Sequence, residues 1–566
     1  MMRTLGKIFL ALIALVMLLA VVLIVIGYLA HRIEPNTVLT LRIEGEVETS
    51  PPRDELTELM AGTRVTVPDI VEALDRAGGD PRITGLELRV GESTMGIADI
   101  QEVRQKIREF NRRGKFSIAY LEFGTNRSYY LASACQTVAL LPTSLLHVRG
   151  LMTSTTFLRG TFDKLAVYPD FLHIGDYKNA TNIYTEKKYT AAHREADQML
   201  LEDISDQFFH GLAESRGMKA EEMEKVIARG PLTAQEALAA KLVDRTAYND
   251  EIRDIVKQRN GGKETRLSLS EYLRRTERAG HTKLAVIYAT GAILPGRSGD
   301  SPLGGEVMGS ETIAEQFRRA REDSSIKAVI LRVDSPGGVS FASEAIRREL
   351  LLTKRQKPVV VSMSDVAASG GYWIAMSANR IVAEPGTITG SIGIFAGKFN
   401  ISGLYQKLGL SKDSITTTDN STIDWPFQNF TPAQRESIMK YMRDVYGEFL
   451  KGVAEGRHMQ VEAVDKVGQG HVWTGERAKQ LGLVDELGGL DAAILAAKSL
   501  AKIPADEAVT LVNLPPPKPF FDAIRDLFGN ASLMASGTML DRWARSLESV
   551  ARIPVWTLLP EVPDVQ

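Results

Sequence analysis

The segment Ile83–Val90, with the sequence ITGLELRV, has a counterpart 243 positions later in Ile326–Val333, with the sequence IKAVILRV. At the same offset, Tyr129–Ala132 (YYLA) falls on Tyr372–Ala375 (YWIA). Similarity that persists at one fixed offset is the signature of an internal repeat. The sequence therefore indicates an internal duplication, in which one domain occurs twice in the chain.

Both copies alternate strand-like and helix-like segments. The short runs Leu86–Val90 and Val329–Val333 are rich in residues that favour strands, and Pro358–Ser364 in the second copy is typical of a buried strand. Each copy closes with a long amphipathic stretch, Ala191–Ser215 in the first and Pro432–Gly456 in the second. Because strands that alternate with helices of about 10–15 residues predict parallel βαβ units, we expect an α/β fold of stacked βαβ units.

The length of 566 residues is too great for a single core. We predict an N-terminal stub and membrane anchor over residues 1–32, a first repeat over 33–275, a second repeat over 280–502 and a proline-containing tail over 503–566. Within the tail we expect one helix, at Gly537–Val550.

The N-terminus predicts a membrane anchor. Ile8–Ala30 contains no charged residue and follows Arg3 and Lys7. A bilayer core about 30 Å thick requires about 20 helical residues, and the apolar part of a cleaved signal peptide has only about 7–15. We therefore expect one uncleaved transmembrane helix. The basic residues before it favour a cytoplasmic N-terminus, with the bulk of the chain outside the cytoplasm.

Composition argues against several classes of function. A formal net charge of −2 gives no reason to expect a nucleic-acid partner. The single cysteine, Cys135, rules out an intrachain disulfide and lies in an apolar stretch, where we expect a buried core residue. The eight histidines form no HExxH pattern and no Cys/His cluster, so we expect neither a metal site nor a cofactor.

The two copies differ at the positions where chemistry is expected. Ser369, in the sequence AASGG, has Asn126 as its counterpart in the first copy. Lys178, in the sequence GDYK, has Ser421 as its counterpart in the second. Neither copy can run a Ser/Lys reaction alone, but together they hold one complete pair. This predicts a single composite active site.

Ser369 has the surroundings of a nucleophile. It is flanked by small residues, and bulky neighbours would block a substrate carbonyl. The Gly370 N–H, in the first helical turn, is a candidate oxyanion donor. The pair Gly337 and Gly338 follows a predicted strand, where glycines let the backbone approach a ligand closely, and the first copy lacks this pair. An ordinary turn without a catalytic role is the alternative interpretation.

Lys178 can act as a base only when it is neutral, which requires burial away from carboxylates. Asp176 lies two residues earlier, and an ion pair with it would keep the lysine charged. An exposed structural lysine is therefore the alternative. Ser391, in the loop Gly390–Gly393, offers a hydroxyl that could orient the lysine, although this loop is also compatible with a plain tight turn. His471 is the histidine best placed to replace the lysine as the base.

Several motifs occur in a specific order: Tyr177-Lys178, Ser335–Gly338 (SPGG), Ala367–Trp373 (AASGGYW), Thr389–Phe395 (TGSIGIF) and Gly470–Gly475 (GHVWTG). With them the chain resembles the long, duplicated form of the signal peptide peptidase A (protease IV) family, over nearly everything between the anchor and the tail. The resemblance implies tandem ClpP/crotonase-like domains with a Ser/Lys dyad. The implied site residues are Ser369 as nucleophile, Lys178 as general base, Ser391 as hydrogen-bond partner of the lysine, and Gly370, Gly337 and Gly338 as oxyanion donors.

The resemblance also implies a homotetramer on the periplasmic face of a bacterial inner membrane, which degrades cleaved signal peptides and other apolar peptides. Asp365 departs from the family pattern, because a small residue is expected there and an acid could perturb the pocket. Two other classes stay open. One is a catalytically inactive, membrane-bound scaffold that binds peptides. The other is an acyl-CoA-handling relative of the crotonases, which would need an acidic catalytic pair and a soluble chain, so the predicted anchor argues against it.

Overall fold

The computed structural model describes residues 32–51, 65–276, 280–300, 306–517 and the backbone of 552–558, together with Met17. The predicted anchor Ile8–Ala30, apart from Met17, and the predicted helix Gly537–Val550 lie outside these residues. Within the described part of the chain, no helix has both the length and the apolar character needed to cross a bilayer.

The first α/β unit is built on a six-stranded sheet in which all neighbouring strands are parallel. Across this sheet the strands are β10 (Arg266–Ser268), β1 (Thr37–Gly45), β2 (Ile83–Ser93), β3 (Phe116–Leu121), β5 (Thr137–Leu140) and β9 (Arg245–Thr246). A separate three-stranded sheet consists of β4 (Gly124–Thr125), β6 (Leu145–His147) and β8 (Leu232–Thr233).

The second unit repeats this strand order. Its parallel strands are β23 (Val509–Leu514), β11 (Thr282–Thr290), β15 (Ile326–Ser335), β17 (Val359–Ala368), β18 (Arg380–Ala383) and β22 (Glu486–Leu487). The strand β19 (Ile388–Gly390) pairs with the end of β17 and with β21 (Val472–Thr474). The matching orders confirm that the sequence repeat is a repeat of a mixed α/β fold. Because β23 follows residue 502, the second unit extends into the segment predicted as a tail.

Helices cover both faces of each sheet, so strands such as β17 are buried nearly throughout. In the first unit, α3 (Val67–Gly79) and α4 (Ile97–Arg112) pack on one face and α11 (Asn249–Arg259) packs on the other. In the second unit, α13 (Ser310–Glu322) and α14 (Ser340–Lys354) pack on one face and α20 (Leu490–Leu500) on the other. Shorter helices include α5 (Asn126–Ala132), α6 (Arg159–Leu165), α9 (Ala220–Ile227), α10 (Ala234–Ala239), α12 (Leu269–Arg275) and α18 (Val461–Val467).

The two long helices form where the sequence predicts them. The first, α8 (Ala191–Arg216), begins after Thr190, whose hydroxyl accepts a hydrogen bond from the His193 N–H, and it ends at the left-handed Gly217. The second, α17 (Pro432–Arg457), begins at a capping box in which the Thr431 hydroxyl accepts from the backbone N–H of Gln434. Caps of this kind satisfy backbone N–H groups that lack helical partners.

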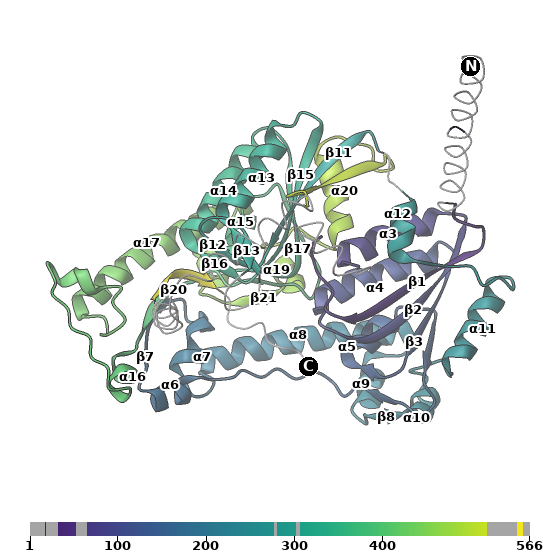
Figure 1. Cartoon of the computed structure of the whole chain (residues 1–566), viewed down its shortest axis with the longest axis horizontal. Coiled ribbons are helices and arrows are strands. Elements are labelled where there is room, and N and C mark those ends of the chain that lie inside the picture. The colour runs from purple at the N-terminus through teal and green to yellow at the C-terminus, as the bar shows by residue number, and fades with distance from the viewer. Residues whose placement is uncertain are drawn as a thin grey trace, which may run out of the picture.

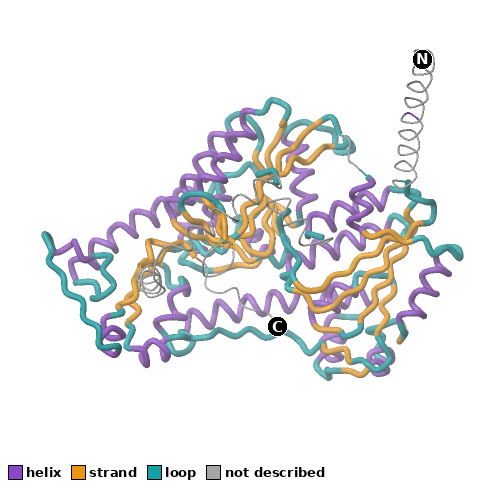
Figure 2. The backbone as a smooth tube through the Cα atoms, in the orientation of Figure 1, coloured by secondary structure: helices purple, strands orange, loops and turns teal. Residues whose placement is uncertain are grey.

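The first repeat reaches over to the second through one strand and one helix. Strand β7 (Tyr168–Ile174) pairs antiparallel with β20 (Ile394–Asn400) of the second repeat. Helix α8 then runs beneath the second unit back to the first (Figure 1), and Leu200 on it packs against Val366 and Ile388. The two clusters of strands remain distinct (Figure 2). The first repeat therefore contributes an arm, made of β7 and α8, to the second unit, and the segment between these two elements carries Lys178.

A third sheet forms where the arm meets the second unit. Its strand order is β13 (Gly299–Asp300), β14 (Glu306–Gly309), β12 (Ala292–Leu294), β16 (Gly337–Val339), β24 (Arg552–Leu558), β20 and β7. The sheet thus combines strands from the first repeat, the second repeat and the C-terminal segment.

Asp365 connects the two repeats. Its carboxylate accepts hydrogen bonds from the backbone N–H groups of Gly96 (3.0 Å), Ala98 (2.9 Å) and Asp99 (3.1 Å), at the start of α4. Gly96 is the N-cap residue of α4 and has no side chain with which to cap the helix. A carboxylate from the second repeat therefore caps a helix of the first, and it complements the positive end of the helix dipole.

This contact predicts a loss of stability in Asp365→Ala. Removing a helix cap costs about 1–2 kcal/mol, so the midpoint of urea unfolding of the full chain should fall. Asp365→Asn keeps a capping oxygen and should lose less. Tryptophan fluorescence during unfolding reports the midpoints, and identical midpoints for Asp365→Ala and the unmodified chain would contradict the capping role.

Candidate active site

Ser369 stands at the junction between strand β17 and helix α15 (Gly370–Ala375). Its backbone has φ +56° and ψ −111°, a positive-φ conformation that non-glycine residues rarely adopt. The Ser369 N–H donates to the Gly390 carbonyl, and the Ser369 carbonyl accepts from the Trp373 N–H, both at 2.8 Å. These bonds hold the strained turn, and the residue is fully buried.

Lys178 reaches Ser369 from the first repeat, just after β7. Its backbone lies against Gly470, where an added Cβ would come within 2.5 Å of the Lys178 nitrogen. The neighbouring Tyr177 N–H donates to the Gln469 carbonyl at 2.9 Å. Held in this way, Lys178 Nζ lies 2.7 Å from Ser369 Oγ. The structure thus brings the two residues of the predicted pair within hydrogen-bond distance.

The lysine amine is surrounded by neutral oxygens. Its Nζ lies 2.7 Å from Ser369 Oγ, 3.0 Å from Ser391 Oγ and 3.2 Å from the Ser391 carbonyl oxygen. Lys178 is only 1% exposed, so the alternative of an exposed structural lysine is wrong. No carboxylate, including that of Asp176, pairs with the amine among the described residues. Burial therefore lowers the pKa of Lys178 well below its ordinary value.

Ser391 lies between Lys178 and His471, and it contacts both. Ser391 also has a positive φ, of +51°, and its N–H donates to the His471 carbonyl at 2.7 Å. The His471 ring stacks on Trp473, with centroids 3.8 Å apart, and its Nδ1 lies 2.8 Å from the Val472 carbonyl oxygen. Burial lowers the pKa of His471. Among the described residues it makes no hydrogen bond to Ser369, so the histidine does not take the position of the base.

The three glycines predicted as oxyanion donors have different surroundings. Gly370 begins α15, so no earlier turn of that helix offers a carbonyl to its N–H. The Gly337 N–H donates to Ser335 Oγ at 3.2 Å. Gly338 lies in β16, where an added Cβ would come within 2.0 Å of the Ile293 carbonyl oxygen. Of the three, Gly370 is the donor directly adjacent to Ser369.

The counterparts of Ser369 and Lys178 in the other repeat make structural contacts. Asn126, the counterpart of Ser369, donates from Nδ2 to the Gly150 carbonyl at 2.9 Å. Ser421, the counterpart of Lys178, interacts with Thr418 in its own turn. Sequence reasoning gave no role to Gly470, although this glycine opens the GHVWTG motif. Gly470 packs against the backbone of Lys178, and this contact forms only when the two repeats come together.

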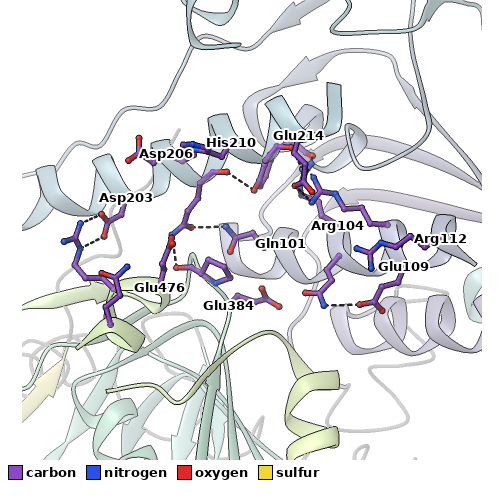
Figure 3. A pocket seen from close by; sticks show the side chains of 18 residues that line it. Gln101, Arg104, Glu109, Arg112, Asp203, Asp206, His210, Glu214, Glu384 and Glu476 are labelled. Atoms are coloured by element: carbon purple, nitrogen blue, oxygen red, sulfur yellow. Dashed lines mark hydrogen bonds and ion pairs between the residues drawn. The ribbon is translucent and has the colours of Figure 1, made fainter. Parts of the chain in front are cut away.

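A cleft of about 910 Å³ lies apart from this pair, at the junction of α4, α8 and α19 (Gly475–Gln480) (Figure 3). Its lining carries charges of both signs, and several are paired, as in the ion pair between Arg477 and Asp203. Neither Lys178 nor Ser369 lines it. Within the described chain, no group of His, Cys, Asp and Glu residues could hold a metal ion. The cleft is a polar seam between the repeats.

Comparison with known proteins identifies the family. The model of peptidase family S49 matches the chain twice, over residues 109–262 and 352–504. The chloroplastic serine protease SPPA of Arabidopsis thaliana is 32% identical over 523 residues, which cover 91% of this chain and 76% of that protein. Protease 4 of Salmonella typhi is 34% identical over 450 residues, which cover 77% of this chain and 72% of that protein.

Among solved structures, a ClpP1 mutant from Listeria monocytogenes matches with a TM-score of 0.24 and 15% identity, over 36% of this chain and 90% of that one. The two matches to the family model together span more than half of the sequence and fall one in each repeat. The chain is therefore a serine protease that belongs to peptidase family S49, with the family's domain present twice.

Proposed function

We propose that this chain is a membrane-anchored serine endopeptidase that uses a Ser/Lys dyad to degrade cleaved signal peptides in the membrane or periplasm. The observation that carries the proposal is the 2.7 Å contact between Lys178 Nζ and Ser369 Oγ in a buried pocket. In this proposal Ser369 is the nucleophile and Lys178 the general base, while Ser391 orients the lysine. A scaffold that only binds peptides would not require a buried amine beside a strained serine.

The chemistry follows from this geometry. Neutral Lys178 accepts the proton of Ser369 as Oγ attacks the scissile carbonyl. The Gly370 N–H stabilises the oxyanion, and a donor of this kind is worth about 3 kcal/mol. The Gly337–Gly338 loop is the second expected source of donors, and its Gly337 N–H would exchange the hydrogen bond to Ser335 Oγ for one to the oxyanion. The lysine then gives its proton to the leaving amine, and water hydrolyses the acyl-enzyme. The two hydrogen bonds to Ser391 aim the amine at Ser369 throughout.

Backbone pairing beside the serine supports an extended peptide as substrate. Ser335, just before β16, pairs with Ala367 of β17, so β16 begins close to the Ser369 turn. Strand β24 lies between β16 and β20 and pairs antiparallel with both. The facing edges of β16 and β20 therefore accept an extended segment by backbone pairing, which is how peptides add to the edge of a sheet.

The N-terminal sequence and the family resemblance supply the rest of the proposal. Ile8–Ala30 would hold the chain in the lipid bilayer of a bacterial inner membrane, as a single-pass anchor with the catalytic units facing the periplasm. The domains would be tandem ClpP/crotonase-like units assembled as a homotetramer. Anchoring would keep the enzyme close to signal peptides and other apolar peptides that remain in the membrane after secretion.

The direct test of the nucleophile is Ser369→Ala. This variant should lose peptide turnover and labelling by a serine-reactive phosphonate, because the attacking oxygen is absent. Ser324→Ala, which changes an exposed serine in the turn between α13 and β15, should behave like the unmodified enzyme. Mass spectrometry locates the label, and a fluorescent peptide measures turnover. Unchanged turnover in Ser369→Ala would favour the scaffold instead.

The buried amine makes a separate prediction about stability. At pH values between the lowered pKa of Lys178 in the folded chain and its ordinary pKa of 10.5, the unfolded state binds more protons than the folded state. The free energy of unfolding should therefore rise with pH over this range. Lys178→Met removes the cost of burying the amine. It should therefore lose turnover yet unfold at a higher urea concentration than the unmodified chain at neutral pH.

The difference in urea midpoint between Lys178→Met and the unmodified chain should become smaller as the pH approaches 10.5. Lys188→Met, which changes an exposed lysine, should differ from the unmodified chain by the same amount at every pH. A lower midpoint for Lys178→Met at neutral pH would indicate that the folded chain holds this lysine in its charged form.

A further inference from the structure

One turn of the second repeat, between α18 and β21, contacts both chain segments that hold the amine of Lys178. On the side of the arm, the Gln469 carbonyl accepts a hydrogen bond from the Tyr177 N–H at 2.9 Å. On the opposite side, the His471 carbonyl accepts one from the Ser391 N–H at 2.7 Å. The position of the lysine relative to its partner Ser391 therefore depends on this turn.

Side chains of the second unit hold the first half of the turn. Gln469 has a φ of +52°, a conformation that side chains other than glycine rarely adopt. Its N–H donates to the Tyr446 hydroxyl at 3.2 Å, and its side-chain amide donates to Asp465 Oδ1 at 2.6 Å. The Tyr446 hydroxyl also donates to Asp465 Oδ1, at 2.7 Å. These bonds fix the carbonyl that receives the arm.

Aromatic rings hold the second half of the turn. The ring of Tyr177, from the first repeat, lies 4.4 Å from the ring of His471, measured between centroids. The His471 ring is stacked in turn on Trp473, at 3.8 Å and an interplanar angle of 8°. Trp473 Nε1 donates to the Val467 carbonyl at 2.9 Å, which fixes the indole. These three rings, here called the ring stack, join the arm of the first repeat to the turn of the second.

The internal repeat shows where the ring stack is needed. The counterparts of its members in the other copy are residues without an aromatic ring: Asn420 for Tyr177 at the offset of 243, and Gly230 for His471 and Leu232 for Trp473 at the offset of 241 that the surrounding segments share. Among these corresponding positions, rings are present only beside the complete Ser/Lys pair. This is expected if the rings serve the pair and not the fold that both repeats share.

Tyr177 also covers an apolar cluster beside the serine. Its half-buried side chain packs against buried residues of α8, β17, β19 and β21, which are Ala196, Leu200, Val366, Ala368, Ile388 and Val472. Ala368 directly precedes Ser369. Burial alone lowers the pKa of Lys178, so a ring that keeps water away from this region favours the neutral amine.

We propose that the ring stack positions the amine of Lys178 against Ser369 and keeps water away from it. In the described part of the chain, none of the three rings forms a hydrogen bond with Lys178 Nζ or Ser369 Oγ. Tyr177, His471 and Trp473 are therefore positioning residues. The inference rests on the proposed Ser/Lys dyad and adds the side chains that set its geometry.

The pH dependence of the reaction of Ser369 with a small phosphonate tests the ring stack. Tyr177→Ala lets water approach Lys178, so the pH of half-maximal rate should rise towards 10.5. At lower pH the rate should fall about tenfold for each pH unit of that rise, because less of the amine is neutral. Tyr177→Phe keeps the ring and should keep the half-maximal pH of the unmodified chain.

The rings themselves should not titrate in the pH range of this test, since burial lowers the pKa of His471 and raises that of Tyr177. The charged groups that act on the rings are Glu195, which acts on both, Asp176, which acts on Tyr177, and Arg477, which acts on His471. All three are retained in every variant. A change in the half-maximal pH therefore reports on Lys178.

Tyr189→Ala is the matched control. Tyr189 lies in the same segment between β7 and α8, is half-buried like Tyr177, and its ring also contacts a histidine, His193, at 4.8 Å. Its hydroxyl donates to Thr155, away from the dyad. This variant loses an equivalent tyrosine–histidine contact and should leave the half-maximal pH unchanged.

A double variant tests whether the rings act together. Side chains that act as one unit have non-additive effects, so Tyr177→Ala with His471→Ala should have the same half-maximal pH as either single variant. If Tyr177→Ala does not fold, as judged by urea unfolding, His471→Ala alone carries the same prediction. Shifts that add in the double variant would contradict a shared ring stack.

Two results would overturn the positioning role. One is an unchanged half-maximal pH in Tyr177→Ala, even if its urea midpoint falls, because the ring would then have a structural role only. The other is an equal shift in Tyr189→Ala. Lys178→Met separates these results from a failure of the dyad: this chain should not react with the phosphonate, and a reaction would contradict the dyad itself.

Discussion

The active site depends on a hydrogen bond between the two repeats, which joins Lys178 Nζ and Ser369 Oγ in a pocket where the described residues place no carboxylate. An amine is useful as a base only when it has lost its charge, and burial among neutral oxygens achieves this without any acidic partner. The same requirement explains why the two copies diverged. Once one repeat supplies the amine and the other the hydroxyl, each can lose the group it no longer uses, as Asn126 and Ser421 show.

The acidic residues lie elsewhere, where they hold the repeats together. Asp365 caps α4 across the junction, and Arg332 reaches from the second unit to Glu102 at 2.7 Å. Burial, followed by the charge of Asp365, raises the pKa of Asp99 well above its ordinary value. The same two causes raise the pKa of Asp334 to about 6. A charged interface thus fixes the position of Ser369 relative to the first repeat, while the pocket of the lysine stays free of charge.

Much of this could be predicted from the sequence because the repeat provides its own alignment. The two long helices, the central strands and the pairing of Lys178 with Ser369 all follow from comparing one copy with the other. The contacts between repeats could not be predicted, because Gly96 and Asp365 lie far apart in the chain and the departure of Asp365 from the family pattern does not say what it contacts. The sequence pattern places β23 in the predicted tail for a similar reason, because the position of this strand is defined by its pairing with β11. The positive-φ backbone of Ser369 and Ser391 likewise depends on bonds to Gly390 and His471.

The central claim is that the pocket holds Lys178 neutral, and the pH dependence of Ser369 acylation by a small phosphonate tests it most directly. The rate should rise with pH and level off at a midpoint well below 10.5, the ordinary pKa of lysine, and Lys178→Arg should react at no pH because arginine stays protonated. A midpoint at the ordinary lysine value, or acylation that survives Lys178→Arg, would contradict the account.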